Sequence, residues 1–358
     1  LPVEQIRKQS QDVLKVLRSG GALPLEKSQL EVQAPEKPLN LILVYLESFN
    51  EIFSNNEHYP GLTPRIDALR NSLLTFDQIH SSGYVTIEGI ANSQCGTLMN
   101  MEYANSSLIS QRGRLSELPC LGDILKQAGY HQTYLGGAGL DFAGKGPFLR
   151  EHGYNETRGW EYWEDKGYER FNDWGLADTV LFDESLERIL SYREQGIPYN
   201  VTLLTLGMHV PGFVNDVCPI YTEDSDKPFV NAIHCSDFLL GQFVDQLEQQ
   251  GILEDTVLFI QADHGSFITS EVMSQFGNSV ADTRLLTLMS VPESVRIDPK
   301  KLGLNSAGSN LNTVATLLEV MGISHNSEFI FSRSHFQPRT DKEYFLTRRQ
   351  DYFGLDRI

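Results

Sequence analysis

The sequence is poor in positive charge. It carries 29 Lys and Arg residues against 47 Asp and Glu residues, which gives a formal net charge of −18 at pH 7. A surface of this sign repels the phosphate backbone of nucleic acids, and the chain has no dense Lys/Arg tract to offset it. We therefore expect no DNA or RNA partner and no purely electrostatic docking on anionic lipid. A negatively charged substrate would need a local positive centre, and a bound metal ion is the simplest one.

The sequence also lacks the run of about 20 apolar residues that a membrane helix needs. Residue 1 is Leu rather than Met and no signal peptide is visible, so we expect a fragment or a processed form that has lost a membrane anchor. Residues 1–20 show a rough helical spacing of apolar side chains, and residues 22–38 are polar and proline-containing. We predict an N-terminal helix and linker over residues 1–38 and one main domain over residues 39–358.

Cysteine is scarce, and no pair has the C-x-x-C spacing of a cysteine-built zinc site. The four cysteines are Cys95, Cys120, Cys218 and Cys235. An even count with two pairs that are close in sequence suggests two disulfides, although four cysteines allow three connectivities. Disulfides would favour an oxidising compartment.

Short apolar runs alternate with amphipathic helices along the main domain. Residues 41–46 form a nearly continuous apolar run, which is typical of a strand buried on both faces of a parallel sheet. Further strands are expected over residues 131–135, 200–206, 256–260 and 285–291, and helices from residue 64 and over residues 121–128, 178–193, 237–250 and 313–321. This alternation predicts the α/β class, with a mostly parallel central sheet flanked by helices.

Polar residues follow three of the predicted strands. Glu47 follows the first strand, His209 comes shortly after the strand at residues 200–206, and Asp263-His264 follows the strand at residues 256–260. In open α/β sheets, ligands gather at the carboxyl ends of the strands. Carboxylate oxygens and imidazole nitrogens are suitable ligands for Mn²⁺ or Zn²⁺. Each position alone would fit an ordinary strand exit, but together they predict a metal or phosphate site.

A threonine between glycines is a further candidate. Thr86 lies in the segment Gly83-Tyr84-Val85-Thr86-Ile87-Glu88-Gly89, which by itself cannot be told from a surface loop or strand. The hydroxyl of threonine is a poor nucleophile in water, but coordination to a divalent metal stabilises its alkoxide at neutral pH. Flanking glycines would let the backbone bring that hydroxyl close to a ligand.

The order Glu47, Thr86, His209, Asp263-His264 resembles the lipoteichoic acid synthase and phosphoglycerol transferase branch of the alkaline phosphatase (sulfatase-like) superfamily. The likeness extends from about residue 39 to residue 335, and its cysteine placement is most similar to the phosphoglycerol transferases that modify osmoregulated periplasmic glucans. The segments that carry it are residues 62–64 (Leu-Thr-Pro), 93–96 (Ser-Gln-Cys-Gly), 120–125 (Cys-Leu-Gly-Asp-Ile-Leu), 142–145 (Phe-Ala-Gly-Lys) and 172–175 (Asn-Asp-Trp-Gly). Residues 39–358 would then be a sulfatase-like catalytic domain.

The resemblance implies roles for individual residues. Glu47, Thr86, Asp263 and His264 would bind one divalent ion, Mn²⁺ before Mg²⁺ or Zn²⁺, and Thr86 would also be the nucleophile. His209 matches the histidine that contacts the substrate. Further substrate contacts are expected from Asp141, Lys145 and Arg333, whereas Trp174 is assigned to packing and His80, His131 and His234 to structure.

The implied activity is the transfer of phosphoglycerol from phosphatidylglycerol to a periplasmic glucan through a covalent intermediate on Thr86. The partners would be an anionic phospholipid donor and a glucan acceptor, and the domain would lie in the periplasm, anchored to the inner membrane. No Cys/Ser-x-Pro-x-Arg signature accompanies Thr86, so a formylglycine sulfatase is not expected. The open alternatives are a phosphoethanolamine transferase, a phosphodiesterase, or a non-catalytic domain that binds glucan or lipid.

Overall fold

The computed structural model describes residues 27–98, 117–295, 307–329, 331–337, 344–349 and 352–357. The helix predicted over residues 1–20 lies outside these ranges. Within the described part of the chain, no helix combines the length and the apolar composition needed to cross a membrane.

The centre of the molecule is a seven-stranded sheet with the order β3-β9-β8-β2-β7-β5-β6. Its strands are β2 (Asn40–Leu46), β3 (Leu74–Thr75), β5 (His131–Gly136), β6 (Glu156–Arg158), β7 (Tyr199–Leu204), β8 (Thr256–Ala262) and β9 (Thr287–Ser290). The five strands from β8 to β6 run parallel, whereas β9 is antiparallel to both β8 and β3. The predicted mostly parallel sheet is therefore confirmed, with one antiparallel edge.

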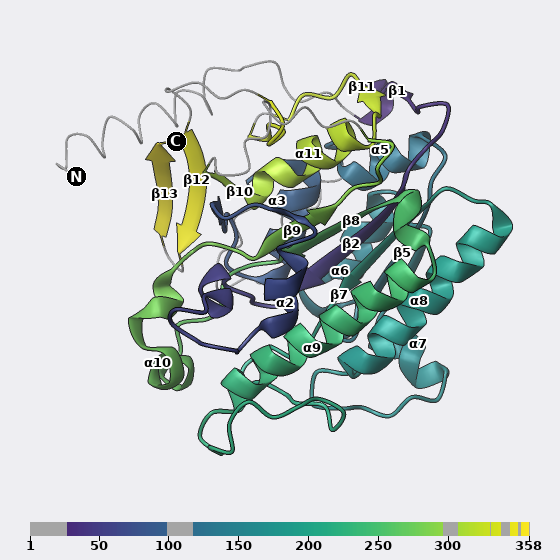
Figure 1. Cartoon of the computed structure of the whole chain (residues 1–358). Helices are drawn as coiled ribbons and strands as arrows, with labels where there is room; N and C mark the ends of the chain where they lie inside the picture. Colours follow the sequence, from purple (N-terminus) through teal and green to yellow (C-terminus); the bar gives the residue numbers. More distant parts are fainter. Residues whose placement is uncertain are drawn as a thin grey trace.

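Helices cover both faces of this sheet (Figure 1). The helices on one face are α2 (Pro64–Leu69), α7 (Trp160–Asp165), α8 (Asp178–Gln195), α9 (Pro228–Gln249) and α10 (Ser270–Phe276). Those on the other face are α3 (Thr86–Cys95), α5 (Leu121–Gln127), α6 (Lys145–Glu151) and α11 (Thr313–Val320). Both faces need this cover because the central strands are apolar on both sides.

Strand β2 shows how the two cores arise. Its side chains alternate between the faces, as the pleat requires. Ile42 and Val44 pack in the core that contains α8 and α9, whereas Leu43 packs in the core that contains α3 and α11. All three side chains are completely buried. An almost continuous apolar run is thus divided between two cores.

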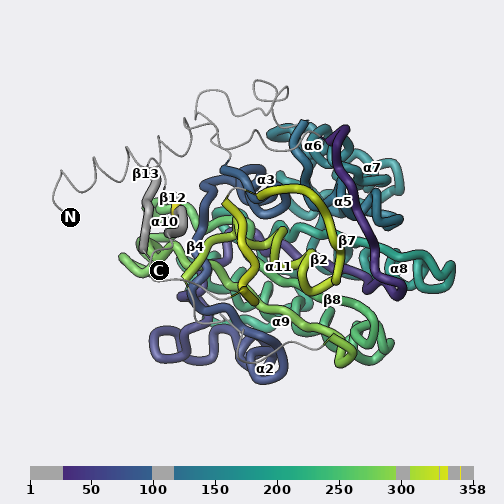
Figure 2. The backbone as a smooth tube through the Cα atoms, turned by 90° about the horizontal axis from the view of Figure 1, so that it is seen from above, coloured from purple at the N-terminus to yellow at the C-terminus, as the bar shows by residue number. Residues whose placement is uncertain are grey.

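The segment before β2 is a strap on the outside of the domain. Short β1 (Val32–Gln33) pairs antiparallel with β11 (Ser324–His325), after the 3-10 turn η1 (Lys27–Gln29). Gln127 in α5 donates a hydrogen bond to the carbonyl of Leu30 at 3.0 Å. Figure 2 shows the strap running along the edge of the molecule beside α5. The part of the predicted linker that is described therefore lies against the domain.

Two disulfides link elements that flank the sheet. Cys95, the last residue of α3, bonds to Cys120, the N-cap of α5. Cys218 bonds to Cys235 in α9. The prediction of two disulfides is confirmed, and the pairing is between neighbours in sequence.

Three short pairs of strands complete the fold. Besides β1 and β11, β4 (Ile79–His80) pairs with β10 (Gly308–Ser309), and β12 (Tyr344–Arg349) pairs with β13 (Tyr352–Arg357). Between β10 and α11 lies the 3-10 turn η8 (Asn310–Asn312). This turn reaches the carboxyl end of β8, where the candidate site lies.

Candidate functional site

The site begins where β2 and β8 end side by side. Leu46 pairs with Ala262 in the parallel register, so Glu47 and Asp263 leave the sheet at the same level. His264 follows directly. All three residues are at most 2% exposed. The structure thus places these three predicted residues side by side at the ends of neighbouring strands.

A short contact orients His264, the second residue after β8. The Nδ1 atom of His264 lies 2.8 Å from the carbonyl of Gly265, which turns Nε2 toward the carboxylates. Nε2 lies 3.5 Å from Oε1 of Glu47 and 3.5 Å from Oδ2 of Asp263. A backbone hydrogen bond at Nδ1 is a common way to present Nε2 to a metal.

Thr86 is the first residue of α3, a position that the sequence did not predict. Its Oγ1 atom lies 3.3 Å from Oε2 of Glu47. The N-cap residue is Val85, which has no side-chain oxygen to cap the first turn. The hydroxyl therefore stands at a helix N-terminus whose N–H groups and dipole favour a negatively charged group.

Glycine is required for α3 to approach β8 so closely. A Cβ atom on Gly89 would lie 2.0 Å from the carbonyl oxygen of Asp263. Asn310 in η8 bridges the same contact, because its Nδ2 atom donates to the carbonyls of Gly89 and Asp263 at 3.5 Å each. Its Oδ1 also accepts hydrogen bonds from the backbone and hydroxyl of Ser82 at 2.9 and 2.5 Å. Sequence reasoning did not single out Asn310, since all of these partners are distant in sequence.

Ser48 adopts a left-handed backbone conformation, with φ of 55°. Such a conformation is uncommon for a residue other than glycine and tends to occur at functional sites. It lets the N–H of Ser48 donate to Oδ1 of Asp263 at 2.9 Å, and its hydroxyl donate to Oε1 of Glu47 at 2.7 Å. The turn after β2 thus holds both carboxylates.

The buried charges strongly influence one another. Burial and the facing carboxylate of Glu47 raise the pKa of Asp263 to about 7. Burial alone would raise the pKa of Glu47, but the rings of His264 and His209 hold it below its usual range. Burial opposes protonation of His264, yet the two carboxylates raise its pKa. Two acidic groups in an apolar setting need positive charge nearby.

These residues fit a divalent metal ion. The Oδ2 atom of Asp263 is buried and, among the residues that the structure describes, has no hydrogen-bond partner. One ligand atom each from Glu47, Asp263 and His264 lie within 4.8 Å of one another. An ion between them would satisfy Oδ2 and offset both negative charges. Thr86, held beside Glu47, would be the fourth ligand.

A second cluster of potential ligands does not fit a metal. Cys95, Cys120 and His152 lie close together among the described residues. The two sulfurs form a disulfide, and the Nδ1 atom of His152 lies 2.8 Å from Oδ2 of Asp123. We assign this cluster to structure.

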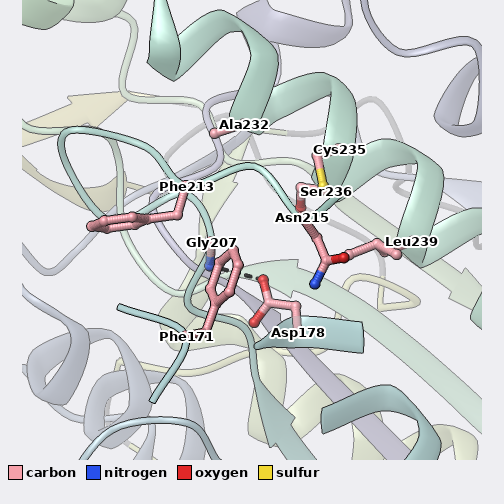
Figure 3. A pocket seen from close by; sticks show the side chains of 9 residues that line it. All are labelled: Phe171, Asp178, Gly207, Phe213, Asn215, Ala232, Cys235, Ser236 and Leu239. Atoms are coloured by element: carbon pink, nitrogen blue, oxygen red, sulfur yellow. Dashed lines mark hydrogen bonds between the residues drawn. The ribbon is translucent and has the colours of Figure 1, made fainter. Parts of the chain in front are cut away.

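His209 lies in the loop after β7, close enough to Glu47 to lower the pKa of that carboxyl. The loop is fixed by Asp178, the first residue of α8, whose carboxylate accepts hydrogen bonds from the N–H groups of Leu206 and Gly207 at 2.7 and 2.8 Å. Figure 3 shows the Asp178 carboxylate beside the backbone of Gly207, at the base of a small pocket. This role of Asp178 could not be predicted from the sequence, because an aspartate at a helix start is common.

Lys145 is the first residue of α6 and is only 4% exposed. Burial lowers the pKa of its ammonium group, while the nearby carboxylates of Glu47 and Asp263 oppose that shift. The ammonium is therefore close enough to these carboxylates to interact with them electrostatically. A buried lysine near two acidic groups is a candidate ligand for phosphate.

The other expected substrate residues are less enclosed. Asp141 is exposed in the loop before α6. Arg333 is partly buried, and its backbone carbonyl accepts a hydrogen bond from Asn312 at 2.7 Å. Their roles in substrate binding stay predictions. His80 and His234 contact Thr283 and the carbonyl of Leu62 through Nδ1, at 2.7 Å each, and His131 lies 3.6 Å from Glu156.

Comparison with known proteins places the chain in a family. The model of the family described as "Sulfatase" matches residues 39–323. Phosphoglycerol transferase I of Xanthomonas axonopodis pv. citri (strain 306) is 31% identical over 305 residues, which cover 81% of this chain and 42% of that protein. The protein of the same name from Salmonella arizonae is 33% identical over 333 residues, covering 90% of this chain and 42% of its own. The chain thus spans less than half the length of these relatives.

A solved structure shows the same fold. Lipoteichoic acid synthase LtaP from Listeria monocytogenes superposes with a TM-score of 0.74 and 19% sequence identity, covering 90% of this chain and 82% of that one. The expected sulfatase-like fold and the resemblance to phosphoglycerol transferases are confirmed. Because the family model matches well over half of the residues of this chain, the chain belongs to the sulfatase family.

Proposed function

We propose that this domain is a phosphotransferase that moves a glycerophosphoryl group from phosphatidylglycerol to a glucan, with Thr86 as the nucleophile. The observation that carries the proposal is the position of the Thr86 hydroxyl, 3.3 Å from Glu47 and at the N-terminus of α3. A purely binding domain would have no need for a hydroxyl at that point. The similarity to phosphoglycerol transferase I supports the choice of transferred group.

Glu47, Thr86, Asp263 and His264 would hold one divalent ion, and their mixed oxygen and nitrogen donors suit Mn²⁺ first, with Mg²⁺ or Zn²⁺ as alternatives. When bound, the ion supplies positive charge that favours the deprotonated hydroxyl and offsets negative charge on the phosphoryl oxygens. The buried Oδ2 atom of Asp263, which has no hydrogen-bond partner in the described part of the chain, supports this site.

In the first half of the reaction, Oγ1 of Thr86 attacks the phosphorus of phosphatidylglycerol. A bond forms between Oγ1 and phosphorus, and the bond between phosphorus and the diacylglycerol oxygen breaks. The hydroxyl proton of Thr86 passes to that oxygen, so diacylglycerol leaves as a neutral alcohol. The N–H groups at the N-terminus of α3 would bind the phosphoryl oxygens.

Lys145 and His209 act on different oxygen atoms in this step. The Lys145 ammonium binds a phosphoryl oxygen, because it is buried and faces the carboxylates. His209 transfers the proton to the leaving oxygen, a role worth about 10²–10⁴-fold in rate. Asp178 keeps His209 in place through the backbone of the loop.

In the second half, a sugar hydroxyl attacks the same phosphorus. The bond from phosphorus to Oγ1 of Thr86 breaks, and the sugar proton returns to Oγ1 by way of His209. The product is a glycerophosphorylated glucan, and the protein regains its starting state. Asp141 and Arg333 are proposed to contact the substrate outside the buried centre.

The proposed location is the periplasm, with the whole protein anchored to the inner membrane that supplies the donor. Two disulfides support an oxidising compartment. A phospholipid donor requires that the domain work at a membrane surface.

The proposal is tested by intact-mass spectrometry of Mn²⁺-loaded protein incubated with phosphatidylglycerol. We expect a glycerophosphate adduct on the wild type, none on Thr86→Ala, and a slower adduct on Thr86→Ser. Turnover should fall about 10³-fold or more in Thr86→Ala, because the attacking atom is absent.

Two other results would redirect the assignment. An adduct formed only from phosphatidylethanolamine would indicate a phosphoethanolamine transferase. No adduct from either lipid, with bound metal absent from a fully stable protein, would indicate a non-catalytic domain. Full activity of Thr86→Ala would exclude the proposed nucleophile.

A further inference from the structure

The mouth of the site has an aromatic wall, formed by Phe142, Trp174 and His209. The rings of Trp174 and His209 lie 3.8 Å apart between centroids, at an angle of 39°. Phe142 meets Trp174 edge to face at 5.5 Å. Sequence reasoning favoured packing for Trp174, but the structure shows that it packs on the histidine of the site itself.

The outer part of this wall is open to solvent. Phe142 is 56% exposed, and Trp174 is partly buried. The exposed ring of Phe142, held against Trp174, is therefore accessible to a ligand that enters the site. The turn that carries Trp174 is fixed, because Oδ1 of Asn172 accepts hydrogen bonds from the N–H groups of Trp174 and Gly175 at 2.8 and 3.1 Å.

Charged groups flank the exposed ring. The ammonium of Lys145 lies 5.7 Å from the centroid of the Phe142 ring, and Asp141, the residue before Phe142, is exposed. An apolar face beside a donor and an acceptor matches a sugar ring, which has C–H bonds on its face and hydroxyls around its edge. The negative face of an aromatic ring attracts such polarised C–H bonds.

A second group of aromatic rings lies beside His264. Tyr84 and Phe267 meet at 5.0 Å, and Phe267 lies 5.3 Å from the ring of His264. Ile268, which is 44% exposed, lines a small cleft there together with polar residues such as Ser81, Ser266 and Thr283. Ile268 therefore provides an exposed apolar side chain outside the aromatic wall for a control substitution.

We propose that Phe142 and Trp174, the outer part of the aromatic wall, are the binding platform for the acceptor sugar. This platform selects a neutral glucan by stacking. The inference rests on the proposed transfer to a glucan. Trp174 contacts His209, and His209 faces Glu47, which in turn lies beside Thr86. A sugar on this platform therefore has its hydroxyl next to the group that takes its proton.

The test separates the two halves of the reaction. Wild type and Phe142→Ala are first loaded with the glycerophosphate adduct from phosphatidylglycerol, and the loss of the adduct is then followed against the concentration of laminaritetraose or cellotetraose. We expect the same rate of loading in both proteins, and a concentration for half-maximal loss that is roughly five- to tenfold higher in Phe142→Ala. Phe142→Tyr should restore wild-type behaviour, and Ile268→Ala should leave sugar dependence unchanged.

Tryptophan fluorescence gives a readout that needs no turnover. The chain has three tryptophans, and Trp160 and Trp163 are at most 5% exposed. Titration of Thr86→Ala with the same tetrasaccharides should change the emission, and the added substitution Trp174→Phe should abolish the change.

The outcomes distinguish the two proposals. A wild type that forms no adduct would refute the transfer, while the fluorescence titration would still report on the wall. A wild type that loads and discharges, with unchanged sugar dependence in Phe142→Ala and no fluorescence response, would overturn the platform alone. A higher requirement for phosphatidylglycerol in Phe142→Ala would assign the wall to the donor and equally overturn the inference.

Discussion

The two ends of the parallel strands differ in a way that identifies the site. At the amino end, a cavity of about 300 Å³ is bordered by Asn40, Arg193 and Asp255. Its charges are already paired, since Nη1 of Arg193 lies 2.6 Å from Oδ1 of Asp255. At the carboxyl end, Asp263 is buried, and its Oδ2 atom has no hydrogen-bond partner among the described residues.

The comparison teaches that polar groups without hydrogen-bond partners distinguish the candidate site from the amino-end cavity. A cavity whose polar groups satisfy one another has little to offer a ligand. A buried carboxylate that faces another carboxylate, and has one oxygen without a hydrogen-bond partner, is stabilised when a cation binds beside it. The general rule that ligands bind at the carboxyl ends of strands is followed here for this physical reason.

The largest expected effect comes from Asp263→Asn. Turnover should fall by about 10³-fold or more, because a charged ligand is lost. The amide oxygen can still accept the N–H groups of Ser48 and His264, so metal-free Asp263→Asn should melt at a higher temperature than metal-free wild type. Metal content by mass spectrometry and Tm by calorimetry check both parts.

The matched control is Asp255→Asn, which changes the same type of side chain at the other end of the sheet. It should keep both the metal and the activity. Equal loss of metal in the two variants would contradict the conclusion that the metal binds at the carboxyl end of the strands.

A medium effect is expected from Asp178→Ala, which belongs to the carboxyl end but is no ligand. Two buried N–H groups, of Leu206 and Gly207, would lose their acceptor, at a cost of about 2 kcal/mol in the free energy of unfolding. Turnover should fall roughly tenfold, because His209 follows these residues in the loop. Metal content should stay at the wild-type level, and its loss would contradict a purely positioning role.

The smallest effect is expected from Arg193→Ala at the amino end. The pair with Asp255 is partly exposed, and such pairs contribute about 0–1 kcal/mol to stability. Activity should change less than about twofold. A large drop in transfer, without a drop in Tm, would show that the amino-end cavity takes part in function.

Sequence reasoning located the parts of the site that depend on strand ends. Glu47, Asp263 and His264 could be predicted because an apolar run marks each strand, and the first polar residue marks its exit. The position of Thr86 at a helix start could not, because Val85 is no capping residue and glycines flank the segment. Tertiary packing, rather than local propensity, begins α3 there.

The start of α9 shows another limit of local patterns. Asp237 was expected at the beginning of this helix, where aspartate is common, but α9 begins at Pro228. The carboxylate of Asp237 instead caps α2, by accepting hydrogen bonds from the N–H groups of Arg65 and Ile66 at 3.0 and 2.7 Å. The predicted helix start at residue 237 is therefore wrong, and the role of Asp237 as a cap could not be predicted because its partners are distant in sequence.

The disulfide between Cys95 and Cys120 has a consequence for how the chain tolerates cleavage. It joins the helix that begins at Thr86 to α5, so these elements are connected by two covalent routes. A protease that cuts once between the two cysteines would leave both pieces in one molecule, and only a reducing gel would reveal the nick. The helix that begins at Thr86 would therefore stay covalently attached to α5 even after the backbone between the two cysteines is cut.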